Sequence, residues 1–341
     1  MQPKNKLYSE TTLFRRWPKN IKEQDKYLFS KEIQKVIPET NLDIIPDAWV
    51  SSYGYFKKTL FTPIHHFSFN TKPSWKEKLK AEIKFNFKHH AKKKLSGRAL
   101  IICDNFSNGY FHWFADALPR LYAIQEHNIP FDILLLPSYC KNEAYIRPSL
   151  IPFSIPSIYQ LEEGERVQAQ QLIALSAIAP TGNYRPEIMQ GIREIYRSYF
   201  QLQNKSPTAK IYISRAKAAR RKINNEQELI PILQNHGYEI VFMEDLPFEN
   251  QVRIVGNAKI VISLHGAGLT NILFMAPGTK VVEIRFPGDQ HNNCYFSLAD
   301  ALDLEYYYLI GEESATKIDP HTDNITVSPF KLESLLNEVE S

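Results

Sequence analysis

The sequence predicts an α/β protein made of two units, each built around a largely parallel sheet. Three observations support this fold class. The chain has 341 residues, which is the length of about two domains. From residue 210 onward, short apolar runs rich in β-branched residues alternate with helical segments, as in parallel strands joined by helices. A similar alternation starts at residue 98, so the first half can form a second unit of this kind.

The second half shows the more regular pattern. Its predicted strands are apolar and cover residues 210–214, 239–243, 259–264, 280–284 and 304–310. The predicted helices between them cover residues 225–235, 248–257, 268–275 and 293–301. Five strands in this alternation form a doubly wound, Rossmann-like domain. The polar stretch 205–209 in front of them is the best candidate for a linker.

The first half is less regular, and residues 1–97 are the hardest part to interpret. Strands are predicted over residues 49–55, 60–64, 98–103, 132–136 and 172–177. Helices are predicted over residues 74–95, 110–125 and 186–200, with a kink or break of the second helix at Pro119. An amphipathic helix over residues 328–338 is predicted near the C-terminus.

Composition excludes several classes of protein. An apolar fraction of 43% and a charged fraction of 23% are ordinary for a globular chain, which excludes disorder, collagen and coiled coil. No run approaches the ~18 apolar residues of a membrane helix, and the N-terminus lacks the apolar region of a secretory signal. Three distant cysteines argue against a disulfide framework. We therefore expect a cytoplasmic protein.

Basic residues are concentrated in two places, although the net charge is only +4. Ten Lys or Arg lie between Lys72 and Arg98, and a second cluster spans residues 215–222. The first is either a solvated helix face or a surface for an anionic membrane or polymer. The small net charge and the absence of a readout motif argue against a nucleic-acid-binding protein.

The candidate anion site lies in the second half, at the carboxyl ends of predicted parallel strands. The strand 259–264 is followed by His265-Gly-Ala-Gly-Leu-Thr-Asn271, where two glycines allow a close backbone approach before a helix N-terminus. The strand 210–214 is followed by Arg215 and Arg221, and arginine can clamp a diphosphate. Glu283 ends another strand and could accept ribose hydroxyls. The alternatives are a structural turn, a solvated loop and a surface carboxylate.

His112 and Asp116 in the first half are four residues apart and share a helix face. An imidazole and a carboxylate together can act as general acid and base, although the pair could equally stabilise the helix together with Arg120. The chain has no D-x-D, G-x-S-x-G, H-E-x-x-H or C-x-x-C sequence. We therefore expect no metal and no cofactor, with arginine and a helix N-terminus supplying positive charge.

Three blocks taken together resemble the family 61 glycosyltransferases. They are N-G-Y-F-H-W-F-A-D-A-L-P-R (108–120), I-Y-I-S-R…R-R-K-I-N-N-E (211–226) and V-I-S-L-H-G-A-G-L-T-N-I-L-F-M-A-P-G-T-K-V-V-E-I (261–284). The resemblance covers about residues 98–311. It implies a GT-B architecture, in which two Rossmann-like domains face each other across a cleft, and an inverting transfer from a UDP-sugar. It also implies a bacterial-type enzyme of surface polysaccharide biosynthesis.

The resemblance also assigns roles to parts of the chain. It implies an acceptor-side domain over residues 1–205, a donor domain over 206–311, and a tail, 312–341, whose helix packs back toward the first domain. His112 and Asp116 match the F-H-W…D…P helix of the family, and we expect Asp116 to be the catalytic base, with His112 as runner-up. For the UDP-sugar the resemblance places, by position and by the anion-site argument, Arg215, Arg221, His265, Gly266, Ala267, Gly268, Leu269, Asn271 and Glu283.

Two functions follow as hypotheses. The first is an inverting glycosyltransferase that moves a sugar from a UDP-sugar to a hydroxyl of a surface polysaccharide or another glycan. Its partners are a UDP-sugar and a glycan acceptor, with peripheral contact to an anionic membrane surface at the inner face of the membrane. The second is a non-catalytic module that binds a nucleotide sugar or an anionic glycan within a polysaccharide assembly complex.

Overall fold

The computed structural model describes residues 5–59, 74–87, 91–203, 206–312 and 319–341. The chain divides into two compact units. Unit 1 comprises residues 1–11 and 36–188, and unit 2 comprises residues 12–35 and 189–341. Each combines helices with a sheet that is wholly or partly parallel, which confirms the predicted α/β class.

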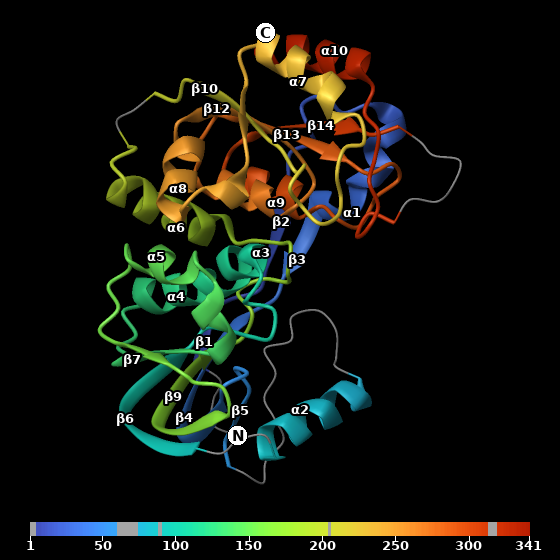
Figure 1. The fold of residues 1–341 in the computed structure, drawn as a ribbon. Coiled ribbons are helices and arrows are strands. Elements are labelled where there is room, and N and C mark those ends of the chain that lie inside the picture. Colours follow the sequence, from blue (N-terminus) through green and yellow to red (C-terminus); the bar gives the residue numbers. More distant parts are fainter. Residues whose placement is uncertain (1–4, 60–73, 88–90, 204–205, 313–318) are drawn as a thin grey trace. The chain divides into compact units, whose positions relative to one another are not determined.

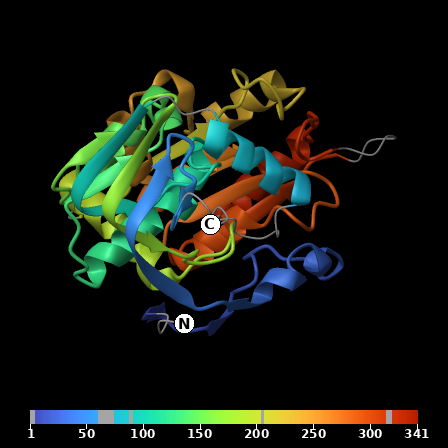
Figure 2. The ribbon, with the colours of Figure 1, turned by 90° about the horizontal axis from the view of Figure 1, so that it is seen from below.

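Unit 1 is built on a sheet of mixed direction. Its strands are β1 (Asn5–Tyr8), β4 (Thr40–Ser51), β5 (Phe56–Lys57), β6 (Ala91–Ile101), β7 (Ile133–Leu136), β8 (Ile158–Gln160) and β9 (Glu165–Leu175). The order is β1-β4-β9-β6-β7-β8, with β5 paired to β4. The pairs β9–β6, β6–β7 and β7–β8 are parallel, whereas β4 runs antiparallel to its neighbours. Figure 2 shows β4, β9 and β6 side by side in blue, green and teal.

Two predictions for unit 1 need correction. The helix predicted over 74–95 is shorter: α2 spans Trp75–Phe87, and β6 already begins at Ala91. The run of lysines before Leu95 is compatible with a helix, but pairing with β9 makes it a strand. The ladder joins Ala91 to Glu165, and Leu95 is buried. Of the strand predicted over 49–55, only residues 49–51 are strand, as the end of the longer β4. The strand predicted over 60–64 lies outside the described residues.

The helix predicted over 110–125 is interrupted, as the proline suggested. It consists of α3 (Tyr110–His112), a π-helical turn (Trp113–Ala117) and α4 (Leu118–Glu126). Pro119 stands in the first turn of α4, where its missing N–H costs least. The chain between β7 and β8 contains a 3₁₀ turn (Ser138–Asn142) and α5 (Ile146–Leu150).

Unit 2 contains a fully parallel sheet. Its strands are β10 (Ala209–Ile213), β11 (Glu239–Val241), β12 (Ala258–Leu264), β13 (Lys280–Arg285) and β14 (Glu305–Ile310). They are ordered β11-β10-β12-β13-β14, and every neighbouring pair is parallel. The predicted doubly wound arrangement of the second half is thereby confirmed, with strand ends that differ by at most two residues.

The helices of unit 2 follow the predicted order. They are α6 (Pro186–Tyr199), α7 (Glu226–Asn235), a 3₁₀ turn (Met243–Asp245), α8 (Phe248–Gly256), a 3₁₀ helix (Ala267–Phe274), α9 (Cys294–Ala301) and α10 (Pro329–Glu340). Within the described ranges, no helix has the length and hydropathy that a bilayer crossing requires.

The C-terminal helix α10 packs on its own unit. It lies beside α7 and contacts β14 (Figure 1). Leu332, Leu335, Leu336 and Val339 are buried in the core that β10, β12, β13 and α7 share. We expected this helix to pack back toward the first domain, but its apolar face is instead buried in unit 2.

The unit boundaries also differ from the predicted division at residues 205 and 311. Residues 12–35 all belong to unit 2. They carry most of β2 (Thr11–Phe14), a 3₁₀ turn (Glu23–Leu28), α1 (Ser30–Ile33) and the start of β3 (Gln34–Ile37). The side chain of Asn20 donates to the carbonyl of Tyr308 at 2.8 Å and accepts its N–H at 3.1 Å, so it covers the edge of β14. Helix α6 joins the same unit, because Arg197 donates to the carbonyls of Gly256 and Phe274, each at 3.0 Å.

Candidate active site

Two loops of unit 2 meet where the strand order of its sheet reverses. The chain passes from β10 to β11 on one side and then to β12 on the other. In an open parallel sheet, this reversal leaves a crevice beyond the carboxyl ends of the strands, where ligands bind. The loop after β10 carries Arg215 and Arg221, and the loop after β12 carries His265 and Gly266. The topology therefore brings together the residues that the sequence suggested for an anion.

Gly266 is required because Arg215 lies against it. Its backbone is extended, with φ 166° and ψ 171°, which any residue can adopt. A Cβ at this position would lie 2.1 Å from Nη1 and 2.6 Å from Cζ of Arg215. The sequence argument rested on backbone freedom, but the structure shows that the space is occupied by a guanidinium. A Cβ on Gly268 would lie 3.1 Å from Cγ2 of Ile213.

Three successive peptide N–H groups in this loop are free to bind a ligand. The N–H of His265 donates to the carbonyl of Ile284, and the N–H of Leu269 donates to the carbonyl of Gly266, each at 2.9 Å. Between them, the N–H groups of residues 266–268 have no hydrogen-bond partner in the described part of the chain. A 3₁₀ helix follows instead of the predicted α-helix, but its first N–H groups are still open. Such clusters of backbone donors bind anions.

Two arginines of the loop after β10 accompany these donors, and Arg215 lies directly against Gly266. Nε of Arg215 donates to the carbonyl of Arg221 at 2.9 Å, and Nη2 donates to the carbonyl of Arg220 at 3.2 Å. Burial and the nearby charge of Arg221 lower the pKa of Arg215 below its usual value. Arg221 has φ 58°, and its buried Nε has no partner among the described residues. A strained backbone of this kind costs on the order of 1–3 kcal/mol and is concentrated at ligand sites.

The basic loop is anchored at its base by Glu226. This buried carboxylate accepts hydrogen bonds from the hydroxyl of Tyr212 at 2.6 Å and from Ser214 at 2.9 and 3.0 Å. Oγ of Ser214 in turn accepts the N–H of Ala216 at 3.1 Å. The side chain of Asn225 binds the N–H and the carbonyl of Val327, at 3.0 and 2.8 Å. The Asn-Glu step at 225–226 therefore fixes the position of the loop.

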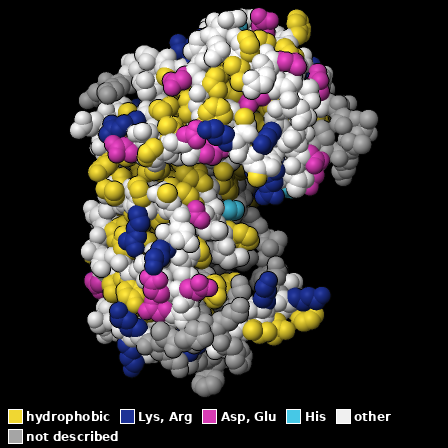
Figure 3. Space-filling model, viewed as in Figure 1, with side chains coloured by type: hydrophobic (Ala, Val, Ile, Leu, Met, Phe, Trp, Pro, Cys, Tyr) yellow, Lys and Arg dark blue, Asp and Glu magenta, His cyan; other side chains and the backbone are white. Residues whose placement is uncertain are grey.

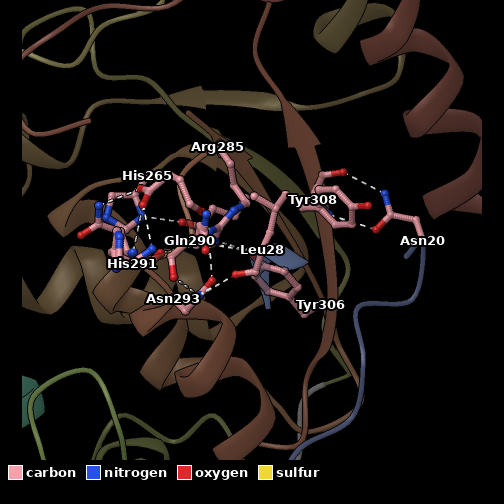
Figure 4. A network of polar contacts seen from close by, with 12 residues as sticks. Asn20, Leu28, His265, Arg285, Gln290, His291, Asn293, Tyr306 and Tyr308 are labelled. Carbon is pink, nitrogen blue, oxygen red and sulfur yellow. Dashed lines mark hydrogen bonds and ion pairs between the residues drawn. The ribbon is translucent and has the colours of Figure 1, made fainter. Parts of the chain in front are cut away.

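His265 belongs to a network of buried polar contacts that also contains Arg285, Asn293 and Tyr306 (Figure 4). Nδ1 of His265 makes a short hydrogen bond with one carboxylate oxygen of Glu283. The other oxygen accepts from the hydroxyl of Tyr306 and, at 3.2 Å, from Nη1 of Arg285. Burial by itself would raise the pKa of Glu283, but the charges of Arg285 and His265 and the hydrogen bonds outweigh it and lower that pKa. Glu283 is therefore held ionised and fixes which ring nitrogen of His265 faces away from it.

The structure changes the roles of two predicted site residues. Glu283 is fully buried and binds three side chains, so it does not stand ready to accept ribose hydroxyls. Asn271 is also buried, and its Nδ2 donates to the carbonyl of Gly268 at 3.0 Å, which holds the turn together. Both residues shape the site from beneath rather than line it.

Arg285 is the residue of this site that the sequence analysis missed. It is buried, and its Nη2 donates to the carbonyl of Asp289 and to Oδ1 of Asn293, each at 2.9 Å. Nδ2 of Asn293 then reaches the carbonyl of Leu28 in the N-terminal segment at 2.9 Å. The available signal was the spacing of Glu283 and Arg285, because residues two apart in a strand share a face.

The second candidate group lies in unit 1, on the interrupted helix. Nδ1 of His112 is 2.7 Å from Oδ2 of Asp116, as their spacing predicted. The hydroxyl of Thr181 lies 3.4 Å from both carboxylate oxygens, a contact that the sequence did not suggest. The side chain of Asp116 is 4% exposed and that of His112 is 32% exposed. The imidazole is therefore the member of the pair that solvent, or a substrate, can reach.

Arg120 belongs to the same group of charges: burial lowers its pKa, and the charges of Asp104 and Asp116 oppose that fall. It is fully buried, donates to the carbonyl of Ile102 at 2.6 Å, and lies 3.7 Å from Oδ2 of Asp104. Burial raises the pKa of Asp104, and the charge of Arg120 opposes that rise. This ion pair anchors the helix to the end of β6 and so holds His112 and Asp116 in place.

Comparison with known proteins gives consistent matches. The family model of glycosyltransferase 61 matches residues 110–282, which include His112, Asp116 and the loops after β10 and β12 and end just before Glu283. The EGF domain-specific O-linked N-acetylglucosamine transferase of Drosophila melanogaster is 30% identical over 223 residues, which cover 58% of this chain and 42% of that protein. Its Bos taurus counterpart is 36% identical over 91 residues, which cover 25% of this chain and 17% of that protein.

A second kind of relative matches a shorter stretch. Protein O-linked-mannose beta-1,4-N-acetylglucosaminyltransferase 2 of Canis lupus familiaris is 38% identical over 95 residues, which cover 25% of this chain and 16% of that protein. The chain thus spans less than half the length of the curated relatives that it matches. The family model nevertheless covers half of this chain in one continuous match. The chain therefore belongs to glycosyltransferase family 61.

Proposed function

We propose that the protein is an inverting glycosyltransferase that moves a sugar from a UDP-sugar to a hydroxyl of a glycan acceptor. The observation that carries this proposal is the anion site at the strand reversal of unit 2. There, three peptide N–H groups without a partner among the described residues lie beside Arg215, and Arg221 is near enough for its charge to lower the pKa of Arg215. A diphosphate carries the charge and the acceptor oxygens that such a set of donors binds.

The arginines and peptide N–H groups of the anion site can also stabilise the diphosphate leaving group of the reaction. As the bond to the anomeric carbon breaks, negative charge develops on the diphosphate. The arginines and the peptide N–H groups stabilise this charge without reorganising, so they lower the barrier more than they strengthen ground-state binding. His265 stands beside them with one nitrogen held by ionised Glu283, so the other nitrogen can donate to a phosphate oxygen. We expect no requirement for a metal ion.

We propose that His112 removes the proton from the attacking hydroxyl and that Asp116 orients it. We expected Asp116 to be the base, with His112 second. Because Asp116 is almost completely buried and already bound to Nδ1 of His112, the exposed imidazole is better placed to reach an acceptor. Asp116 would then stabilise the imidazolium that forms during the reaction.

The names of the relatives suggest the sugar to test first. The relatives described above are named as N-acetylglucosamine transferases, so we propose UDP-N-acetylglucosamine as the first donor to try. For the acceptor we retain a surface polysaccharide or another glycan. We further propose a GT-B arrangement, with unit 2 binding the donor and unit 1 contributing the base.

The alternative is a non-catalytic module that binds a nucleotide sugar or an anionic glycan. Such a module needs the anion site but not the hydrogen-bonded His112–Asp116 pair, which this chain has. We also propose a cytoplasmic location, with peripheral contact to an anionic membrane surface through the exposed lysines of α2.

A thermal-shift screen of nucleotides with and without EDTA tests the proposal first. Ligands that bind only the folded protein raise its melting temperature. We expect stabilisation by UDP and by one UDP-sugar, unchanged by EDTA, followed by release of UDP when an acceptor is added. No shift with any uracil nucleotide would reject the donor site. Binding without turnover over a broad acceptor panel would instead favour the non-catalytic module.

A further inference from the structure

Helix α2 of unit 1 exposes large apolar side chains along one side. Trp75, Leu79 and Ile83 are 70%, 52% and 47% exposed. They are four residues apart, so they form one continuous stripe along the helix. We refer to these three residues as the α2 stripe. Exposed apolar residues are ordinary when scattered, but a stripe of three large ones indicates a binding surface.

The opposite side of α2 already packs against its own unit. Ala81 and Phe85 are buried, and the carbonyl of Phe85 accepts from Nη1 of Arg166 at 3.2 Å. Glu82, which flanks the stripe three residues after Leu79, binds the buried ammonium of Lys57 at 2.5 Å. The stripe is therefore not the core-facing side of the helix, and no described part of the chain buries it.

Lysines lie beside the stripe. Lys76, Lys78 and Lys80 are all exposed, and none of them forms an ion pair with a described carboxylate. Figure 3 shows dark-blue and yellow side chains together over α2. A helix with Trp, Leu and Ile on one side and exposed lysines beside them is the pattern of helices that lie in a membrane interface. The occupant should therefore be apolar inside and negatively charged at its surface.

We propose that α2 inserts the α2 stripe into the interface of an anionic lipid bilayer and lies in the plane of the membrane. Its 13 residues span only about 20 Å, less than the ~30 Å hydrocarbon core, so it cannot cross. An anionic polysaccharide would use the lysines but not Leu79 and Ile83. A second copy of the chain docking on the same stripe would bring like-charged lysines together. This proposal assigns the membrane contact to the α2 stripe, and it does not depend on sugar transfer.

The test uses the whole chain and vesicles of phosphatidylcholine, with or without phosphatidylserine, in a flotation assay. The first variant, L79Q/I83Q, removes the apolar contact but retains Trp75. Both residues are exposed, so the fold should not suffer. F330Q, which replaces another exposed aromatic residue (79%) on α10, is the matched control. The second variant, K76Q/K80Q, removes charge only.

We expect the wild type and F330Q to float with phosphatidylserine vesicles, and L79Q/I83Q to bind at least about tenfold more weakly. K76Q/K80Q should lose roughly fivefold per lysine on anionic vesicles, and the loss should vanish at high salt. The fluorescence of Trp75 should shift to the blue on binding and be quenched by brominated lipid. A W75F variant identifies this signal among the four tryptophans.

Three results would overturn the proposal. One is no flotation at low salt with phosphatidylserine vesicles. Another is equal binding of the wild type and L79Q/I83Q. The third is concentration-dependent dimerisation that L79Q/I83Q abolishes, without vesicle binding, because it would make a second copy the occupant. UDP binding should be the same in all these variants, so failure here is distinct from failure of the proposed transferase function.

Discussion

Replacing Gly266 with alanine should damage UDP binding through Arg215. The new Cβ would lie 2.1 Å from Nη1 and 2.6 Å from Cζ of that arginine, far inside van der Waals contact. The backbone of Gly266 is extended, so alanine itself introduces no strain. The guanidinium is the end of a flexible side chain and should move away rather than force the strands apart. Stability should therefore change little.

The cost to binding follows from the lost charged contact. A hydrogen bond to a charged group contributes about 1.5–3 kcal/mol, which corresponds to roughly 10- to 150-fold in the dissociation constant. Titration calorimetry with UDP should show this weakening for G266A and a similar weakening for R215A. Thermal unfolding should show a melting temperature close to that of the wild type for G266A.

A double-mutant cycle provides the control. If the methyl group acts by displacing Arg215, G266A should add almost nothing in a chain that already carries R215A. Fully additive losses would refute the reasoning, because they would mean that the methyl group blocks the ligand directly. Unchanged affinity in folded G266A would refute it as well, because Arg215 would then not contact the diphosphate.

Three further predictions concern other residues. D116N should lower kcat about 10²- to 10⁴-fold and retain the affinity for UDP. D43N, which replaces an exposed aspartate, should have no effect. Normal turnover of D116N would exclude a catalytic role for the His112–Asp116 pair. E283Q should cost about 3–5 kcal/mol, because it leaves its buried arginine partner uncompensated, whereas the exposed E249Q should cost less than about 1 kcal/mol. The folded-state pKa of Glu283 is lowered, so its ionised carboxylate stabilises the fold at a pH above the unfolded-state pKa near 4.5. This stabilisation is lost as the pH falls through the folded-state pKa. The unfolding free energy of E283Q, measured with denaturant, should therefore change less with acid pH than that of the wild type. R221G should relieve the strain of the left-handed backbone at this position, so it should raise the melting temperature while weakening UDP binding. A lower melting temperature would show that the backbone of Arg221 is not strained.

The second half of the fold could be predicted from the sequence because its signals are local. Each strand of unit 2 is a short apolar run, and each carboxyl end is followed by a polar or glycine-containing loop. The α/β class also indicates that these carboxyl ends share one edge of the sheet. The loops that carry Arg215, Arg221 and His265-Gly266 could therefore be predicted to lie at one edge without knowledge of the strand order.

The first half and the unit boundaries could not be predicted in the same way, because they depend on distant pairings. β6 is a strand because it pairs with β9, although its lysines are equally compatible with a helix. Residues 12–35 belong to unit 2 because contacts such as Asn20 with Tyr308 join positions 288 residues apart. No periodicity in a local window records such a contact.

The sequence by itself determined which chemical groups this protein has: arginines and glycines after parallel strands, and a histidine four residues before an aspartate. The tertiary structure decided what each group does. It buried Glu283 beneath His265 with Arg285 as its partner, and it placed the guanidinium of Arg215 in the space that a side chain on Gly266 would fill. The physical reason is that burial and close packing depend on which segments meet in space, whereas residue type and spacing are properties of the chain alone.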